Sequence, residues 1–256
     1  MAAKERKVPD HVLAMLEEME ANGALLHMHP RKLDRKDYED MNRVVAALGG
    51  QWKGGKTKAH VFPPGTDVAA LVETVLTTGR YEDPKDADFV ETPVRLASSM
   101  ADRGRVRKGS DVFEPSAGLG RIARAARSAG GIVTCVELSQ IRAKQLESEG
   151  FPVICADFLT VGVPTEPNGF DVVLMNPPFS KQQDITHVRH AYRFLRPGGR
   201  LVAIMSAGVL FRQNKKTVEF REWVESLGGD IEELPDGTFA EEGTMVRAVI
   251  VTIDWA

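Results

Sequence analysis

Segments with the patterns of strands and helices alternate along the chain from Asp88 to its last residue, and this alternation constrains the fold more than any other feature. It is the signature of a mostly parallel, doubly wound α/β sheet with helices on both faces. We expect strands at 111–114, 132–137, 153–156, 170–175, 200–205, 230–234 and 246–254, and helices at 93–100, 119–129, 139–149, 185–195 and 218–226.

The first eighty-odd residues have a different pattern and predict a small α/β module, residues 1–85, ahead of a large domain, residues 86–256. The spacing of apolar residues indicates helices at 8–23, 34–48 and 67–77. The stretch QWKGGKTKAHVF lies between the last two of these helices, and its Gly-Gly pair predicts a β-hairpin.

The predicted hairpin is rich in cations. It carries Trp52, Lys53, Lys56, Lys58 and His60 within nine positions and has no acidic residue among them. A basic hairpin with an aromatic ring can lie along phosphates and stack on a base, so these residues are candidates for nucleic-acid binding. The alternative is an ordinary soluble turn with Trp52 packed on the neighbouring helices.

The bulk properties are those of a protein that buries a core, with 43% hydrophobic and 27% charged residues in a chain of 256. No apolar run reaches the roughly 18–20 residues that cross a bilayer, and no secretory signal follows the first charged residues. Cys135 and Cys155 each lie in an apolar run, which predicts small core residues in a reducing, cytoplasmic compartment. The formal net charge is −3, so basic groups that contact a nucleic acid must be local.

The stretch DVVLMNPPFSK (171–181) predicts a buried strand that ends abruptly at a rigid corner. Pro177 and Pro178 have no backbone N–H, and each forces the residue before it into an extended conformation. The side-chain amide of Asn176 and the ring of Phe179 are therefore held at the end of the strand. An amide and a flat ring suit a planar amine, although the same four residues could simply turn a strand into a loop.

Three more strand ends carry polar or glycine-rich groups, and open α/β sheets bind ligands at the carboxyl ends of their strands. In EPSAGLG (114–120), an acid precedes glycines that allow close approach of a ligand, but the full GxGxxG phosphate fingerprint is absent. Glu137, followed by Leu138, lies where an acid binds a ribose diol. Asp157-Phe158 could accept an exocyclic amine and cover a purine ring.

Together these motifs resemble the class I S-adenosylmethionine-dependent methyltransferases, and specifically the amino-methyltransferases that make N6-methyladenine in DNA, in the gamma order of motifs. The likeness runs from about Asp88 to the end of the chain. It implies a seven-stranded Rossmann-like sheet, S-adenosylmethionine as cofactor and DNA as the nucleic-acid partner. The cofactor-binding residues implied are Phe89, Thr92, Pro93, Glu114, Ser116, Ala117, Gly118, Gly120, Glu137, Leu138, Asp157, Phe158 and Asn176.

The resemblance implies that Asn176, Pro177, Pro178 and Phe179 are catalytic, as the (D/N)PP(Y/F) motif. In this mechanism, Asn176 Oδ1 and the carbonyl of Pro177 accept the two N–H groups of the target amine, whose lone pair then faces the methyl group. Phe179 stacks on the base, which has been flipped out of the duplex. The chemistry needs no metal, and no cluster with metal-ligand spacing is visible in the sequence.

Other groups are candidates for substrate contact. Phe239 could be a second stacking partner for the base or a core residue under the final hairpin. Basic residues that could line a nucleic-acid path are Arg103, Arg105, Arg107, Lys108, Arg212, Lys215 and Lys216. The alternatives to DNA adenine are methylation of RNA bases or of a protein glutamine amide, or a silent nucleic-acid-binding relative. The size of the chain fits an orphan or mobile-element enzyme.

Overall fold

The computed structural model describes residues 5–28, 33–63, 66–82, 90–165 and 168–255. The chain divides into two compact units, which are described separately. The first comprises residues 1–87 together with 139–151, and the second comprises residues 88–138 together with 152–256. Among the described residues, no helix has the length and apolar character that a bilayer span requires.

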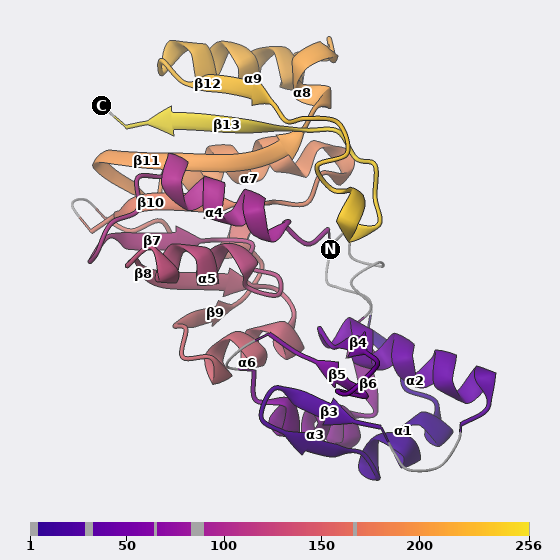
Figure 1. Ribbon diagram of the computed structural model, residues 1–256. Coiled ribbons are helices and arrows are strands. Elements are labelled where there is room, and N and C mark those ends of the chain that lie inside the picture. The colour runs from indigo at the N-terminus through magenta and orange to yellow at the C-terminus, as the bar shows by residue number, and fades with distance from the viewer. Residues whose placement is uncertain (1–4, 29–32, 64–65, 83–89, 166–167, 256) are drawn as a thin grey trace. The chain divides into compact units, whose positions relative to one another are not determined.

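The second unit is built on a seven-stranded sheet in the order β12-β13-β11-β10-β7-β8-β9 (Figure 1). Its first five strands in the sequence pair in parallel, while β13 runs antiparallel to both β11 and β12. The strands are β7 (Asp111–Glu114), β8 (Ile132–Glu137), β9 (Val153–Cys155), β10 (Phe170–Met175), β11 (Leu195–Ser206), β12 (Asp230–Glu233) and β13 (Ala248–Asp254). The predicted fold class, a mostly parallel α/β sheet of seven strands, is confirmed.

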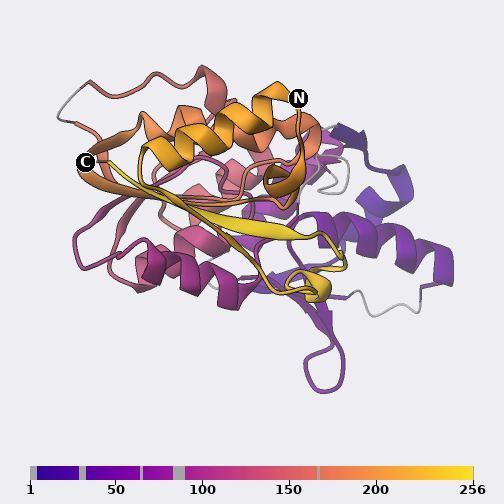
Figure 2. The same cartoon turned by 90° about the horizontal axis from the view of Figure 1, so that it is seen from above.

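Helices cover both faces of this sheet, as its strand order requires; Figure 2 shows α4 and α9 on opposite sides of it. The helices are α4 (Val94–Arg103), α5 (Arg121–Ser128), α7 (Gln183–Tyr192), α8 (Gly208–Phe211) and α9 (Lys215–Ser226). A hydrophobic core cluster joins β10, β11 and β13 to α7 and α9, with Val173, Val188 and Phe220 fully buried within it. This core fixes the strand ends that carry the site.

The predicted bounds of this unit differ from the structure mainly around Leu195. The sequence predicted a helix as far as this residue, but α7 ends at Tyr192 and Leu195 already pairs with Phe170 of β10. The strand β11 then shifts register before Arg200 pairs with Val172, so the segment with Pro197 and two glycines forms an irregularity inside the strand and not a turn ahead of it. A second correction concerns Cys155, which is exposed because β9 is an edge strand.

The first unit contains a four-stranded antiparallel sheet in the order β2-β3-β5-β4 and a two-stranded ribbon of β1 and β6. Its strands are β1 (Glu5–Lys7), β2 (Glu20–Asn22), β3 (Leu25–His27), β4 (Gln51–Lys53), β5 (Ala59–Val61) and β6 (Arg80–Glu82). Its helices are α1 (Asp10–Glu17), α2 (Arg35–Ala47), α3 (Val68–Thr78) and α6 (Gln140–Ser148). The predicted hairpin around the Gly-Gly pair is confirmed as β4 and β5, in which Trp52 pairs with His60.

Two predictions for this unit were wrong. The first helix ends at Glu17 and not near Gly23, because Gly23, at φ +57°, lies in the turn of a second hairpin, β2–β3. His60 adds no cation to the basic hairpin: its side chain is fully buried, and burial lowers its pKa to about 4.

Helix α6 follows β8 in the sequence yet belongs to the first unit. Ile141 packs against the core formed by α1, α2 and α3. The hydroxyl of Thr66 donates to Glu149 at 3.3 Å, and the backbone N–H of Asp67 donates to Ser148 Oγ at 3.2 Å. The first unit is therefore assembled from two separate stretches of the chain.

Candidate active site

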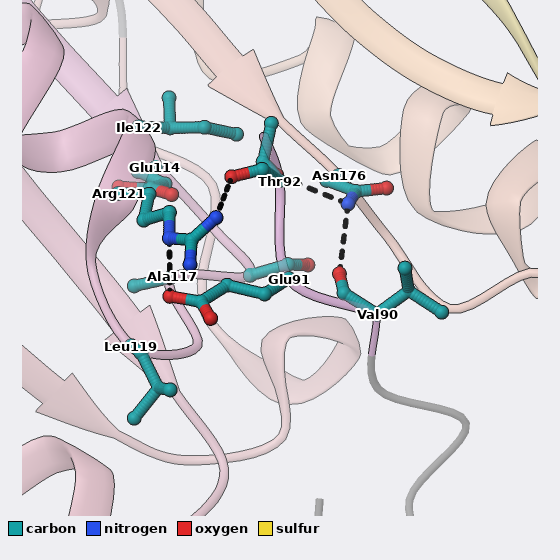
Figure 3. Close-up of a pocket in the computed structure, with 10 residues that line it drawn as sticks. Val90, Glu91, Thr92, Glu114, Ala117, Leu119, Arg121, Ile122 and Asn176 are labelled. Carbon is teal, nitrogen blue, oxygen red and sulfur yellow. Dashed lines mark hydrogen bonds and ion pairs between the residues drawn. The ribbon is translucent and has the colours of Figure 1, made fainter. Parts of the chain in front are cut away.

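The side chain of Asn176 lies directly after β10, between the ends of β7 and β11. Its Nδ2 donates to the carbonyl oxygen of Val90 at 3.2 Å and to Thr92 Oγ1 at 3.1 Å. A backbone carbonyl can only accept, so the nitrogen must face Val90. The oxygen consequently points away from both partners, as Figure 3 shows, and remains an acceptor at the strand end.

The chain after the two prolines is held in a constrained turn. Phe179 is half-buried, and the next turn places both Lys181 and Gln182 at positive φ, 51° and 57°, which is uncommon for residues other than glycine. Helix α9 fixes this turn: Gln182 Nε2 donates to Thr217 Oγ1 at 2.7 Å, and Lys216 Nζ donates to the carbonyl of Gln182 at 2.6 Å. Backbone strain of this kind persists only where the surroundings hold it.

The glycine loop after β7 is tied to the end of β8. Gly118 and Gly120 adopt φ values of +55° and +80°, which a side chain would disfavour, and Gly120 caps α5. The N–H of Gly118 donates to Glu137 Oε2 at 2.7 Å, and the N–H of Ala117 donates to the carbonyl of Val136 at 3.0 Å. Two predicted cofactor elements, the glycine loop and the acid of the next strand, are thus in direct contact.

Glu114 ends β7 with only 1% of its surface exposed. Burial raises its pKa well above the ordinary value, and the nearby Glu137 adds to the effect, against a backbone hydrogen bond from Ala123 and the charge of Arg124. Its Oε2 is buried with no hydrogen-bond partner among the described residues. A buried acceptor without a partner at a pocket wall is a site for a ligand donor.

Arg121, the first residue of α5, was not predicted as a site residue. Its Nε contacts Glu91 Oε1 at 2.5 Å, and its Nη1 reaches Glu242 Oε1 at 2.6 Å and the carbonyl of Thr92 at 3.0 Å. All three ionic side chains are less than a fifth exposed. Even beside this arginine, burial raises the pKa of Glu91, so its desolvation outweighs the attraction.

These groups line a small pocket that is partly open to solvent (Figure 3). Its walls come from the segment before α4, the end of β7, the glycine loop, the start of α5 and the end of β10. They carry six side chains that can form hydrogen bonds with a ligand or with one another: Glu91, Thr92, Glu114, Ser116, Arg121 and Asn176. The remaining lining residues are Val90, Ala117, Leu119 and Ile122.

The aromatic residues among the predicted site residues are mostly buried. Phe158 is 3% exposed, and its ring packs against Phe113 and Phe194, so it belongs to the core and does not present a face for a purine. Phe239 is 1% exposed, which favours the core alternative over the stacking one. Phe89 lies outside the described residues.

The other predicted residues differ in exposure. Leu138 is 37% exposed, which leaves it accessible for apolar contact with a ligand. Asp157 is exposed and accepts the N–H of Leu159 at 3.0 Å. Pro93 is buried and precedes α4.

The predicted nucleic-acid contacts of the hairpin belong to the first unit, which is described separately from this pocket: Trp52, Lys53, Lys56 and Lys58. Within the described ranges, no three His, Cys, Asp or Glu side chains group as a metal site.

Comparison with known proteins gives a partial family match and a fold. Residues 113–203, less than half of the chain, match the family described as Methyltransferase domain. S-adenosylmethionine is the cofactor that this domain implies, and the orphaned, buried acceptor Glu114 Oε2 fits a ligand with cationic and hydroxyl donors. Comparison with curated proteins finds no match.

Among solved structures, the chain is similar in fold to subunits of type I restriction-modification systems. A subunit of a putative type I restriction enzyme from Vibrio vulnificus superposes with a TM-score of 0.56 and 14% identity over 95% of this chain and 60% of that chain. A type I methyltransferase subunit from Streptococcus thermophilus gives a TM-score of 0.55 and 22% identity over 64% and 44%. The chain spans less than two thirds of either protein, and the likeness establishes the fold.

Proposed function

We propose that this protein transfers a methyl group from S-adenosylmethionine to the exocyclic N6 amine of adenine in DNA. The observation that carries the proposal is the orientation of Asn176, whose nitrogen is bound to Val90 and Thr92 and whose oxygen is left as an acceptor at the edge of the cofactor pocket. An amide held in this way selects a ligand that donates an N–H.

The chemistry follows from the electronic structure of the amine. The lone pair of an exocyclic amine is conjugated with its ring, so the nitrogen is a poor nucleophile until both N–H groups are held out of the ring plane. Asn176 Oδ1 and the carbonyl of Pro177 are the two acceptors that this task requires. Because the proline pair fixes the backbone and Thr92 fixes the amide, the acceptors are preorganised and need little rearrangement during the reaction.

The base must leave the duplex to reach a strand end, and a ring beside Asn176 then holds it by stacking. Phe179 is half-buried and follows the prolines, so it fits this role. Phe239 does not fit while its ring remains 1% exposed. A substrate-induced movement of the segment 235–247 would be needed before Phe239 could contact a base.

The cofactor supplies the reactive methyl group. In the proposal, Glu114 accepts from its amino-acid part, Glu137 from its ribose, and Leu138 and Asp157 contact its adenine. The hydrogen bond from the N–H of Gly118 to Glu137 orients the ribose-binding carboxylate beside the glycine loop. Thr92, a predicted cofactor-binding residue, also positions the proposed catalytic amide, because its buried hydroxyl accepts the hydrogen bond from Asn176 Nδ2.

DNA is the favoured substrate because several of the structural neighbours are subunits of type I restriction-modification systems. A third neighbour, with a TM-score of 0.51, belongs to a type I restriction-modification system that assembles as a complex and undergoes a conformational transition. By analogy, partner subunits are a second expectation for this chain. RNA bases and glutamine amides also present planar nitrogens, so they are the substrates to test if DNA fails.

The test is transfer of labelled methyl from S-adenosylmethionine to adenine-containing duplex DNA, followed by nucleoside digestion and mass analysis. Wild type should produce N6-methyladenine, and Asn176→Ala should produce none while still binding the cofactor in calorimetry. Label in RNA or in a glutamine-containing protein, with none in DNA, would replace the substrate and keep the domain assignment. Cofactor binding without transfer to any of the three would indicate a silent relative.

A further inference from the structure

The last two residues of α8, the turn after it and the first residue of α9 form a run of six exposed residues, Leu210 to Lys215, here called the 210–215 loop. Phe211 has 65% of its surface exposed and Leu210 has 37%. A phenylalanine that keeps two thirds of its surface in water forgoes the stabilisation that burial would give it. An exposed aromatic of this kind calls for an explanation in terms of a partner.

The loop is braced, so the exposure of Phe211 does not reflect a loose segment. Arg221 of α9 donates from Nη1 to the carbonyls of Val209 and Arg212, at 2.9 Å each. Asn214 caps α9 by accepting the N–H of Thr217 at 3.1 Å. Hydrogen bonds on both sides of Phe211 therefore hold its backbone in place.

The loop lies beside the proposed catalytic corner. Strand β11, which leads into α8, is the parallel neighbour of β10, and Ala203 pairs with Met175 immediately before Asn176. The strained turn after the proline pair is bonded to the first turn of α9 through Gln182, which contacts both Thr217 and Lys216. A substrate strand that places its base at Asn176 must pass close to this turn.

The local charge has the sign that a nucleic acid requires. Residues 207–218 contain Arg212, Lys215 and Lys216 and no acid, and residues 176–183 contain Lys181 and no acid, in a chain whose net charge is −3. Lys181, Arg212 and Lys215 are exposed. Lys215 faces Glu219 at 3.7 Å, an exposed ion pair that binds weakly and can be exchanged for a phosphate.

We propose that the 210–215 loop binds the DNA strand that carries the target adenine, with Phe211 stacking on the base next to the flipped one and Arg212 and Lys215 on the flanking phosphates. Flipping a base removes the stacking partner of its neighbour, and an aromatic ring can replace that partner. This inference rests on the proposed function and deepens it, because it assigns a substrate contact outside the proline motif.

The experiment compares Phe211→Ala with Phe211→Trp and with Ile132→Ala. Ile132 is 60% exposed at the first residue of β8, so this control lies at the opposite end of the strand from the proposed site. Binding of fluorescent duplex oligonucleotides and their methylation would be measured with cofactor affinity and thermal unfolding as folding checks. Phe211→Ala should raise the Kd and KM for DNA by at least about fivefold, with cofactor Kd unchanged. Phe211→Trp should restore them.

A second variant tests the phosphate contacts. Replacing Arg212 and Lys215 together by glutamine should lower the slope of log K against log salt by about two, because each phosphate contact releases about one counterion.

The outcomes separate the two proposals. If wild type methylates adenine and Phe211→Ala binds DNA as well as Ile132→Ala, the loop inference is overturned and the proposed function stands. If wild type binds DNA in a manner that depends on Phe211 but adds no methyl group to adenine, the loop inference stands and the proposed function falls. If wild type binds no DNA, both are rejected.

Discussion

The amide nitrogen of Asn176 donates to the hydroxyl oxygen of Thr92 across 3.1 Å, between residues 84 positions apart in the sequence. This bond joins the segment before α4, which lines the pocket proposed for the cofactor, to the corner that would hold the target amine. Because the hydroxyl of Thr92 is buried at 5% exposure, water replaces it poorly as an acceptor. A change at Thr92 should therefore affect the chemical step as well as cofactor binding.

Replacing Thr92 with valine should lower kcat. Valine has nearly the shape of threonine but cannot accept the hydrogen bond, so Asn176 keeps only its bond to Val90 and its amide can rotate. The loss of one such bond is about 1 kcal/mol, or roughly fivefold in rate. Thr92→Ser keeps the hydroxyl and should retain most of the activity. Single-turnover methyl transfer checks this, and equal rates for the two variants would argue against the positioning role.

Glu114 should make cofactor binding release a proton. Burial raises the pKa of the Glu114 carboxyl. At any pH between the ordinary pKa and the raised pKa, the folded protein keeps a proton on this carboxyl that the unfolded chain has lost. Stability of the free protein should accordingly fall as pH rises through this window. A cationic donor in the pocket favours the ionised carboxylate, so cofactor affinity should rise with pH in the same range.

Calorimetry in two buffers of different ionisation enthalpy measures the protons released on cofactor binding. Wild type should release a fraction of a proton that depends on pH, and Glu114→Gln should release none from this site. Undiminished release by Glu114→Gln would assign the linkage to another group. The same variant should also flatten the loss of thermal stability with rising pH.

The sequence predicted correctly those parts of the site whose position depends only on where one strand ends. The strands β7, β8 and β10 begin and end at the predicted residues, because each is a short apolar run bounded by polar or turn-forming residues. Asn176 and Glu137 follow such runs, so their place at the carboxyl edge follows from the strand ends alone.

The missed features depend on contacts between distant segments. Arg121 meets Glu242 across 121 positions, and neither local sequence carries a sign of the pairing. The ring of Phe158 could turn toward the pocket or the core, and only the packing of Phe113 and Phe194 decides this. Helix α6 has a helical pattern that was recognised, but which core its Ile141 joins depends on α3.

Arg121→Ala should destabilise the second unit by about 2–3 kcal/mol, because it leaves the carboxylates of Glu91 and Glu242 partly buried and repelling one another. Thermal unfolding would show this loss. Glu242→Gln in the same background should restore part of it, since it removes one of the two charges. Absence of any rescue would indicate that the arginine acts through its bond to the carbonyl of Thr92.

A matched control for this loss is Arg103→Ala. Arg103 forms a bidentate pair with Glu232 at 2.6 and 2.8 Å, but both side chains are a third or more exposed. Exposed pairs contribute about 0–1 kcal/mol, so this variant should unfold close to wild type. A similar cost for the two arginines would mean that burial does not distinguish them.

The first unit cannot be tested cleanly by deleting the residues before Asp88. Helix α6 belongs to the same unit, and the deletion would strip Ile141 of the core on which it packs. Loss of activity would then report a damaged fold, so point variants on the hairpin surface are needed.

Replacing Lys53, Lys56 and Lys58 by glutamine should weaken DNA binding and lower its salt slope by roughly 2–3 if all three contact phosphates. The three side chains are exposed on one hairpin, and His60 beside them is neutral, so the lysines alone supply its charge. The control removes the same charge elsewhere in the unit, at the exposed Lys7, Lys36 and Lys144. Because net charge changes equally in both triple variants, a larger effect of the hairpin variant on the slope locates the DNA contact. Equal slopes would reduce the hairpin to a solvated turn and leave recognition to the methyltransferase unit.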